Sequence, residues 1–370
     1  MLKIMLTGDV HLGRKFSNYP DEVSQKLEEA RYHALEKVVK EGNKRGCNIL
    51  AVAGDLFDKI TTPDQVVIRA VDILNNFSGD TVLVLPGNHD YKQIEAWDTF
   101  RNNLTGKMVL LDKEEKYDLN NLDLEVSVFP APCDNKESQE NKLNWIKDFE
   151  KGEENTYTIG IAHGALAGVS PDMTDSYFKM TGEELRDLNM DLWLLGHTHV
   201  PYPQIKEGNE ITSRTIFNSG TPEPDGLHYR YSGQAWYIEI DETKQIEAQT
   251  IQTGNYFFQD IAREISKEED IKKLVKALCD NNSHKQILRL NLSGRINQEL
   301  YNKKNDYYRE IEEAAVYARI LDNDLNLKIT ADKIAEEFPA DSFPSQILKE
   351  LLEDDKALEL AYELMQEVKE

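Results

Sequence analysis

The stretch "TVLVLPGNHD", residues 81–90, joins a run of apolar residues to a glycine and three polar side chains. Its apolar part is short, near-continuous and closed by Gly87, which is typical of a strand covered on both faces. Asn88, His89 and Asp90 then fall at the edge of a buried sheet, where polar groups lose their hydration and need partners. A metal ion is one partner that would satisfy an amide, an imidazole and a carboxylate together.

Four further apolar runs of this kind occur in the first half of the chain, at residues 2–6, 48–53, 158–162 and 191–195. A three- and four-residue repeat of apolar residues over 23–45 predicts a helix, so the chain begins with parallel βαβ units. More alternating patterns predict antiparallel strands at 124–132, 214–222, 235–241 and 246–253. We therefore expect a mixed α/β first domain of two packed sheets flanked by helices, in four layers ordered α/β/β/α.

The dense, glycine-terminated strands stop near residues 252–260, which predicts a domain boundary there. The expected first domain is therefore 1–255. Residues 256–340 contain two helix-like segments and a strand-like one, enough for a smaller α/β cap module. Residues 341–370 carry a helical repeat of apolar residues and predict a terminal helix with Ser345 as a candidate N-cap.

The composition of the chain limits the classes of protein to which it can belong. The chain has 370 residues, 40 % hydrophobic and 30 % charged, with no run near the roughly 18 apolar residues of a membrane helix. Cys47, Cys133 and Cys279 form neither a disulfide framework nor a metal-binding pair, so we expect a soluble cytoplasmic protein without membrane contact. The net charge of −24 argues against loose, field-driven binding to nucleic acid. Formation of a homodimer is a further possibility.

Each of the five apolar runs is followed by residues able to bind a metal: Asp9 and His11, Asp55, Asn88, His163, and His197 with His199. Singly, such residues are more often turns or hydrogen-bonded core groups. Together, they should converge, because the carboxyl ends of parallel strands form one crevice. Carboxylate, amide and imidazole donors without a thiolate favour Mn, Fe or similar ions over a closed structural zinc site. Asp55, alone in its motif, is the candidate to bridge two cations about 3.5–4 Å apart.

These motifs resemble those of the calcineurin-like metallophosphoesterase superfamily over roughly residues 1–225. The matching stretches are "DVH" (9–11), "GDLFD" (54–58), "GNHD" (87–90), His163 and "GHTH" (196–199). The resemblance implies one metal held by Asp9, His11, Asp55 and His199, and a second held by Asp55, Asn88, His163 and His197. It also implies that His89 donates a proton or hydrogen bond to the leaving oxygen and that Asp90 orients His89. Mn is the expected ion, with Fe, Mg and Zn as alternatives.

Longer stretches resemble the SbcD family and the YhaO-like DNA repair exonucleases of bacteria: "GDVHLGRKF" (8–16), "GDLFDKITTP" (54–63), "GHTHVPYPQ" (196–204), "NSGTPEPDG" (218–226) and "ILRLNLSGRI" (287–296). The residues at 218–221 depart from the family's Pro-Gly-Ser, and the spacing from His199 to Gln204 is longer than usual. The resemblance implies a DNA exonuclease, with endonuclease capacity open, that serves as nuclease subunit beside an SbcC-type SMC-like ATPase. The chain has no P-loop pattern, so any ATP dependence must come from another chain.

Basic residues near the metals or among aromatics are candidates for DNA contact. Arg14 and Lys15 follow Asp9 closely, and residues 284–309 form an island of six basic and two acidic residues with three tyrosines. The DNA-binding candidates are Arg14, Lys15, Lys285, Arg289, Arg295, Lys303 and Lys304. A solvated helix face is the alternative for the island.

Two other functions remain open at this stage. One is a phosphatase or phosphodiesterase acting on small or protein phosphoesters, which the net acidity favours. The other is a non-catalytic scaffold for an ATPase, which the intact motif set disfavours. The acidic segment 341–370 either docks such a partner or packs on its own domain.

Overall fold

The computed structural model describes residues 1–119, 125–147, 149, 156–171, 176–204, 210–212, 214–228, 231–280 and 283–367. The chain divides into two compact units, Met1–Phe258 and Gln259–Glu370. No described helix has both the length and the apolar character needed to cross a membrane.

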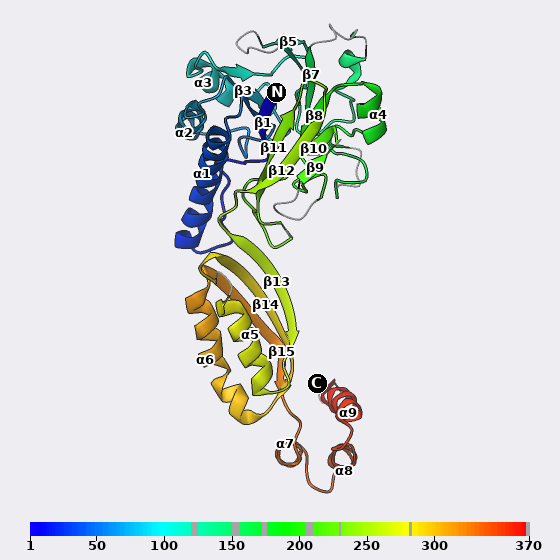
Figure 1. Cartoon of the computed structure of the whole chain (residues 1–370). Coiled ribbons are helices and arrows are strands. Elements are labelled where there is room, and N and C mark those ends of the chain that lie inside the picture. The colour runs from blue at the N-terminus through cyan, green and yellow to red at the C-terminus, as the bar shows by residue number, and fades with distance from the viewer. Residues whose placement is uncertain are drawn as a thin grey trace. The chain divides into compact units, whose positions relative to one another are not determined.

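The first unit contains a seven-stranded sheet in the order β4-β3-β2-β1-β11-β12-β9 (Figure 1). Its strands are β1 (Leu2–Thr7), β2 (Ile49–Ala53), β3 (Thr81–Leu85), β4 (Met108–Leu110), β9 (Glu210–Thr212), β11 (Gln234–Ile240) and β12 (Ile246–Gln252). The four strands from β1 to β4 run parallel, and β11 joins β1 in antiparallel register. Helices α1 (Asp21–Lys44), α2 (Asp64–Asn75) and α3 (Ala96–Asn102) cover the outer face through one apolar cluster.

A five-stranded sheet, β10-β8-β7-β6-β5, packs on the inner face of the first. Its strands are β5 (Tyr117–Asp118), β6 (Val126–Ala131), β7 (Tyr157–His163), β8 (Leu192–Gly196) and β10 (Ile216–Asn218). Its far face packs against the short helix η1 (Asn144–Ile146) and α4 (Gly182–Asp187). The predicted α/β/β/α layering is confirmed, as are the five strands that precede the metal-binding residues.

The pairing of two strands differs from the prediction. The alternating patterns at 124–132 and 214–222 indicated antiparallel strands, but β10 pairs in parallel with β8, and β6 pairs in parallel with β7 and antiparallel with the two-residue β5. Alternation of residue types does not fix pairing direction, which depends on how the connecting chain crosses the fold. The strands β11 and β12 form the antiparallel pair expected from the pattern.

The second unit contains a three-stranded sheet, β13-β14-β15, with two helices on one face (Figure 1). Its elements are β13 (Phe257–Glu264), α5 (Glu268–Asp280), η2 (Ser283–Lys285), β14 (Gln286–Ile296), α6 (Gln298–Ala314) and β15 (Tyr317–Leu327). This is the smaller α/β module that the sequence predicts.

The end of the chain forms short helices instead of the single one expected over 341–370. These are α8 (Phe343–Glu350) and α9 (Asp355–Glu367), and another short helix, α7 (Ala331–Glu337), precedes them. The N-cap of α8 is Ser342, which accepts from the backbone of Ser345, the cap expected from the sequence. The side chain of Asp354 accepts from the backbone N–H of Ala357 and starts α9, which explains the break. Residues 368–370 lie outside the described part of the chain.

Candidate metal centre

The seven predicted ligands come from five strand ends and meet at one place. Asp9 and His11 follow β1, Asp55 follows β2, Asn88 follows β3, His163 ends β7, and His197 and His199 follow β8. All but His197 and His199 are almost fully buried. The structure therefore brings these side chains together as the strand-end prediction expects.

Two imidazoles surround the amide oxygen of Asn88 on the β3–β7–β8 side of the cluster. The Oδ1 atom of Asn88 lies 3.0 Å from Nε2 of His163 and 3.1 Å from Nδ1 of His197. Nδ1 of His163 donates to the carbonyl of Ala53 at 2.8 Å. That bond keeps a proton on Nδ1 and leaves Nε2 facing the cluster, where it can bind a metal ion once it loses its own proton.

A second group of donors lies on the β1–β8 side. Nε2 of His11 is 3.0 Å from Nε2 of His199, and the latter atom is 3.5 Å from Oδ1 of Asp9. Asp55 lies between the two groups, with its Oδ2 atom 3.8 Å from His11 and 3.3 Å from His163. This geometry is compatible with the predicted bridging position of Asp55.

The backbone at the centre adopts conformations that side chains normally avoid. Asp9, His11, Asp55 and His197 have φ angles of 52°, 50°, 52° and 90°. Left-handed conformations of non-glycine residues are uncommon and concentrate at functional sites, where the surrounding structure holds them. Close packing adds a further requirement, because a Cβ atom on Gly87 would lie 2.2 Å from Oδ1 of Asp55.

The charges of the cluster suit divalent cations. Asp9 and Asp55 are buried, and neither forms an ion pair with a lysine or arginine among the described residues. Burial raises the pKa of Asp9 well above its usual value. Burial alone would also raise the pKa of Asp55, but His163 and other imidazoles hold it well below its usual range. Two buried carboxylates whose nearby cationic partners are imidazoles and whose other partners are backbone N–H groups fit a site completed by metal ions.

His89 is oriented by Asp58. Its Nδ1 atom lies 2.9 Å from the carbonyl oxygen of Asp58, and its backbone N–H donates to Oδ1 of Asp55 at 2.8 Å. The Asp58 carboxylate also lies 3.6 Å from Nδ1 of His11. With Nδ1 engaged, Nε2 is the nitrogen of His89 left for a substrate.

The expected contact between Asp90 and His89 does not form, which corrects the role given to Asp90. Its Oδ1 accepts from the backbone N–H of Gly87 at 2.7 Å, and its Oδ2 accepts from that of Phe57 at 2.9 Å. Asp90 is fully buried and ties the loop after β3 to the loop after β2. Its side chain satisfies backbone donors in two loops and so cannot also reach an imidazole that turns toward the pocket.

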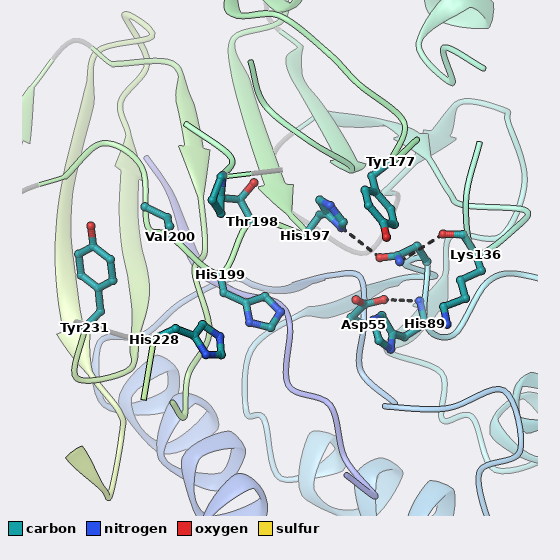
Figure 2. A pocket seen from close by; sticks show the side chains of 12 residues that line it. Asp55, His89, Lys136, Tyr177, His197, Thr198, His199, Val200, His228 and Tyr231 are labelled. Atoms are coloured by element: carbon teal, nitrogen blue, oxygen red, sulfur yellow. Dashed lines mark hydrogen bonds between the residues drawn. The ribbon is translucent and has the colours of Figure 1, made fainter. Parts of the chain in front are cut away.

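A pocket of about 600 Å³ opens beside the cluster (Figure 2). Besides Asp55, Asn88, His89, His197 and His199, it is lined by Lys136, Pro171, Tyr177, Thr198, Val200, His228 and Tyr231. The ring of Tyr177 lies 5.2 Å from that of His197, tilted by 34°. The backbone carbonyl of Lys136 accepts from Asn88 at 3.3 Å. The pocket thus joins metal-binding side chains to aromatic rings and one lysine.

Most of the predicted DNA-contacting cations already have carboxylate partners. Arg14 pairs with Asp225 and Lys15 with Glu28. In the second unit, the pairs are Arg289 with Asp260, Arg295 with Glu359 and Glu363, Lys303 with Glu299, and Lys304 with Asp322. Lys285 is exposed in η2. The local excess of positive charge counted along the sequence is therefore largely offset by acidic residues that the fold brings beside it.

Sequence reasoning missed Asp58, Lys136 and Tyr177. Asp58 stands within the quoted "GDLFD", so its presence was visible but not its contact with His89. Lys136 follows β6, and a parallel assignment of that strand would have placed its end beside the other strand ends. Tyr177 follows residues 172–175, which lie outside the described part, and it carried no motif.

Metal binding should release a proton from His163. Burial alone would lower the pKa of this imidazole, but the carboxylates of Asp55 and Asp9 outweigh it and raise the pKa to about 9. A ligand imidazole must be neutral, so apparent Mn²⁺ affinity should rise about tenfold per pH unit between pH 6.5 and 8. Calorimetric titrations in buffers of different ionisation enthalpy measure the release directly. Binding without proton release at pH 7 would contradict this.

Comparison with known proteins gives one family match and several distant relatives. Residues 2–201 match the family model described as calcineurin-like phosphoesterase. The protein named uncharacterized metallophosphoesterase YhaO of Bacillus subtilis is 22 % identical over 54 % of this chain and 48 % of its own length. The D subunit of the SbcCD nuclease of Staphylococcus saprophyticus is 24 % identical over 66 % of this chain and 63 % of its own length.

Among solved structures, TT1561 of Thermus thermophilus matches with a TM-score of 0.40 and 13 % identity, over 68 % of this chain and 99 % of that one. The chain spans about half to just under two thirds of the length of the two curated relatives. The family match covers more than half of the chain, including the ends of all five strands that supply the clustered side chains. This protein therefore belongs to the calcineurin-like phosphoesterase family, whose members use a dinuclear metal site.

Proposed function

We propose that this chain is a metal-dependent DNA nuclease that removes nucleotides from DNA ends by phosphodiester hydrolysis. The observation that carries the proposal is the pocket beside the metal-binding cluster, lined by Tyr177, Tyr231, Lys136 and His228 (Figure 2). Aromatic rings beside a cation suit a nucleotide, because every base can stack and every phosphate is anionic. Within the described part of the chain, the Lys136 amine forms no ion pair with a carboxylate, which leaves it for a phosphate.

The side chains would divide the work as follows. Asp9, His11, Asp55 and His199 would hold one cation, and Asp55, Asn88, His163 and His197 the other, with Mn as the proposed ion. Such cations supply Lewis acidity toward the phosphate and favour ionisation of water near neutral pH. His89, its Nδ1–H held by the Asp58 carbonyl, would donate in its imidazolium form through Nε2 to the leaving oxygen. Lys136 would hold the phosphate, and Tyr177 would stack on a neighbouring base.

The wider role follows from the relatives. One of them is named as part of the nuclease SbcCD, and we propose the same kind of role in DNA repair here, with an SbcC-type ATPase as partner. Exposed apolar side chains of α8 and α9, Phe343, Leu360 and Leu364, support a docking role for this segment. Arg295 also binds Glu359 and Glu363 of α9, which supports the alternative that the segment packs on its own unit.

A second candidate is a phosphodiesterase for small substrates. It is favoured by the carboxylate partners of Arg14, Lys15 and four cations of the second unit, which leave few basic groups for a DNA backbone. The net charge of −24 also favours a small substrate over a DNA polyanion.

Substrate comparison separates the two candidates. The purified chain with Mn²⁺ should degrade end-labelled duplex DNA to mononucleotides and should hydrolyse a bis-nitrophenyl phosphate dye less efficiently, as judged by kcat/KM. Release of short internal fragments from circular DNA would indicate endonuclease action as well. Preference for the dye would favour the small-substrate phosphodiesterase, and preference for a phosphopeptide would favour a phosphatase.

Lys136→Ala sharpens this comparison. We expect the variant to raise KM for DNA and to reduce the slope of log KM against log salt concentration by about 1, because one phosphate contact is lost. Hydrolysis of the small dye should change much less. The matched control is Lys113→Ala, an exposed lysine away from the pocket that pairs with Glu115. An unchanged salt slope would show that Lys136 does not bind the DNA backbone.

A further inference from the structure

A buried arginine lies behind the metal-binding cluster and belongs to none of the motifs. Arg31 comes from the middle of α1 and is 1 % exposed. Its Nη1 atom donates to the carbonyl oxygen of Val10 at 2.7 Å, and its Nη2 atom lies 3.3 Å from Oδ2 of Asp225. A buried guanidinium is costly unless paired and hydrogen-bonded, so its position calls for a physical account.

The residue that Arg31 binds occupies a particular place in the chain. Val10 lies between Asp9 and His11, and both neighbours have left-handed φ angles, of 52° and 50°. Two such residues on either side of a single residue make an unfavourable turn that persists only when outside contacts hold it. On one side, the N–H groups of Asp9 and His11 bond to the carbonyls of Gly54 and Asp55. Arg31 holds the carbonyl between them.

Asp225 connects this arginine to a third segment. It follows β10, is buried, and also accepts from Arg14 Nη1 at 2.9 Å. From the same loop, the hydroxyl of Thr221 lies 2.9 Å from the carbonyl oxygen of Asp9. Helix α1, the loop after β1 and the loop after β10 are thus tied together at the backbone that carries Asp9 and His11.

We infer that Arg31, held by Asp225, is a positioning residue that sets the backbone of Asp9 and His11 for binding one of the two cations. This rests on the proposed dinuclear site and adds a group outside it. The side chains assigned to the other cation alone, Asn88, His163 and His197, come from β3, β7 and β8. The partners of Arg31 belong instead to the loops after β1 and β10. The two cations should therefore respond differently to loss of the guanidinium.

The test is Mn²⁺ binding by the metal-free full chain carrying Arg31→Met. Calorimetry and Mn²⁺ electron paramagnetic resonance should resolve two sites in the parent. In the variant, affinity at one site should fall about 10–100-fold, the usual effect of removing an outer-shell partner, while the other keeps parental affinity. Arg31→Lys, which retains a donor for the Val10 carbonyl, should recover part of the loss.

A matched control is Arg69→Met. Arg69 also pairs with α1, through Glu29, but away from the loop after β1, and both sites should keep parental affinity. If Arg31→Met does not fold, Asp225→Asn is used, which keeps the Val10 bond and should weaken the same site by a smaller factor. Equal affinity at both sites in a folded variant, or equal loss at both, would overturn the inference.

The Mn²⁺-binding experiment contains no DNA, so its result does not depend on which substrate the protein cleaves. A parent that binds two Mn²⁺ ions but cuts no DNA would defeat the proposed nuclease function and leave the role of Arg31 standing. A parent that binds fewer than two ions would overturn the inference itself.

Discussion

Asp55→Asn is expected to abolish phosphodiester hydrolysis, lowering kcat about 10³-fold or more, and to remove the pair of Mn²⁺ ions together. Loss of the metals forfeits several kcal/mol of transition-state stabilisation, and each 1.36 kcal/mol is tenfold in rate, which gives about 10³-fold. The carboxylate lies between both donor groups, 3.3 Å from His163 and 3.8 Å from His11. Asparagine keeps an oxygen for the His89 N–H, so the loop geometry is retained and the test addresses charge.

The measurement combines kcat with Mn²⁺ stoichiometry on the same folded sample. The control is Asp72→Asn, an exposed carboxylate on α2 that should leave both values unchanged. A folded Asp55→Asn protein that still binds two ions would remove the bridging assignment, and with it the physical basis of the proposed enzyme.

His89→Ala is expected to keep both Mn²⁺ ions while kcat on DNA falls about 10²–10⁴-fold, the usual range for a lost general acid. His89 borders the pocket through a ring whose Nδ1–H is held by the Asp58 carbonyl, so the imidazolium form presents Nε2–H to the leaving oxygen. A leaving group that is a weak base needs little help from a proton donor. The loss should therefore be much smaller on a nitrophenyl diester than on DNA.

The comparison of leaving groups decides the role of His89. Equal losses on DNA and on the nitrophenyl diester would show that His89 acts in binding or positioning instead of proton donation, and a DNA rate equal to the parent's would remove it from catalysis. The control is His33→Ala, an exposed histidine on α1. Metal content, measured in parallel, separates loss of the donor from damage to the cluster.

The predictions from sequence succeeded where the signal is local. A short apolar run that ends in glycine and a metal-binding residue identifies a strand and its end within about ten residues, and five such runs predicted the order of β1, β2, β3, β7 and β8. Pairing direction was harder, because β6 and β10 read as antiparallel but pair in parallel with β7 and β8. The direction of a strand is set by how its connection crosses the fold, which local alternation does not encode.

The contacts that hold the site residues in place could not be predicted from the sequence for the same reason. Asp90 adjoins His89 in sequence, yet its carboxylate serves the backbone of Gly87 and Phe57, while Asp58, 31 residues away, holds the imidazole. The basic island at 284–309 likewise acquired most of its carboxylate partners, such as Asp322 and Glu359, from outside the segment. Side chains find partners through space, so adjacency along the chain predicts them poorly.

The sequence by itself determined which side chains stand at the strand ends, because donor type and strand periodicity are written in consecutive residues. Only the tertiary structure decided which of them face one another, as with His11 and His199, 188 residues apart and 3.0 Å between their Nε2 atoms. It also decided which buried groups, such as Arg31, hold them in place. The physical reason is that charge pairing and backbone strain are resolved by contacts between segments distant in the chain, and no short stretch specifies those contacts.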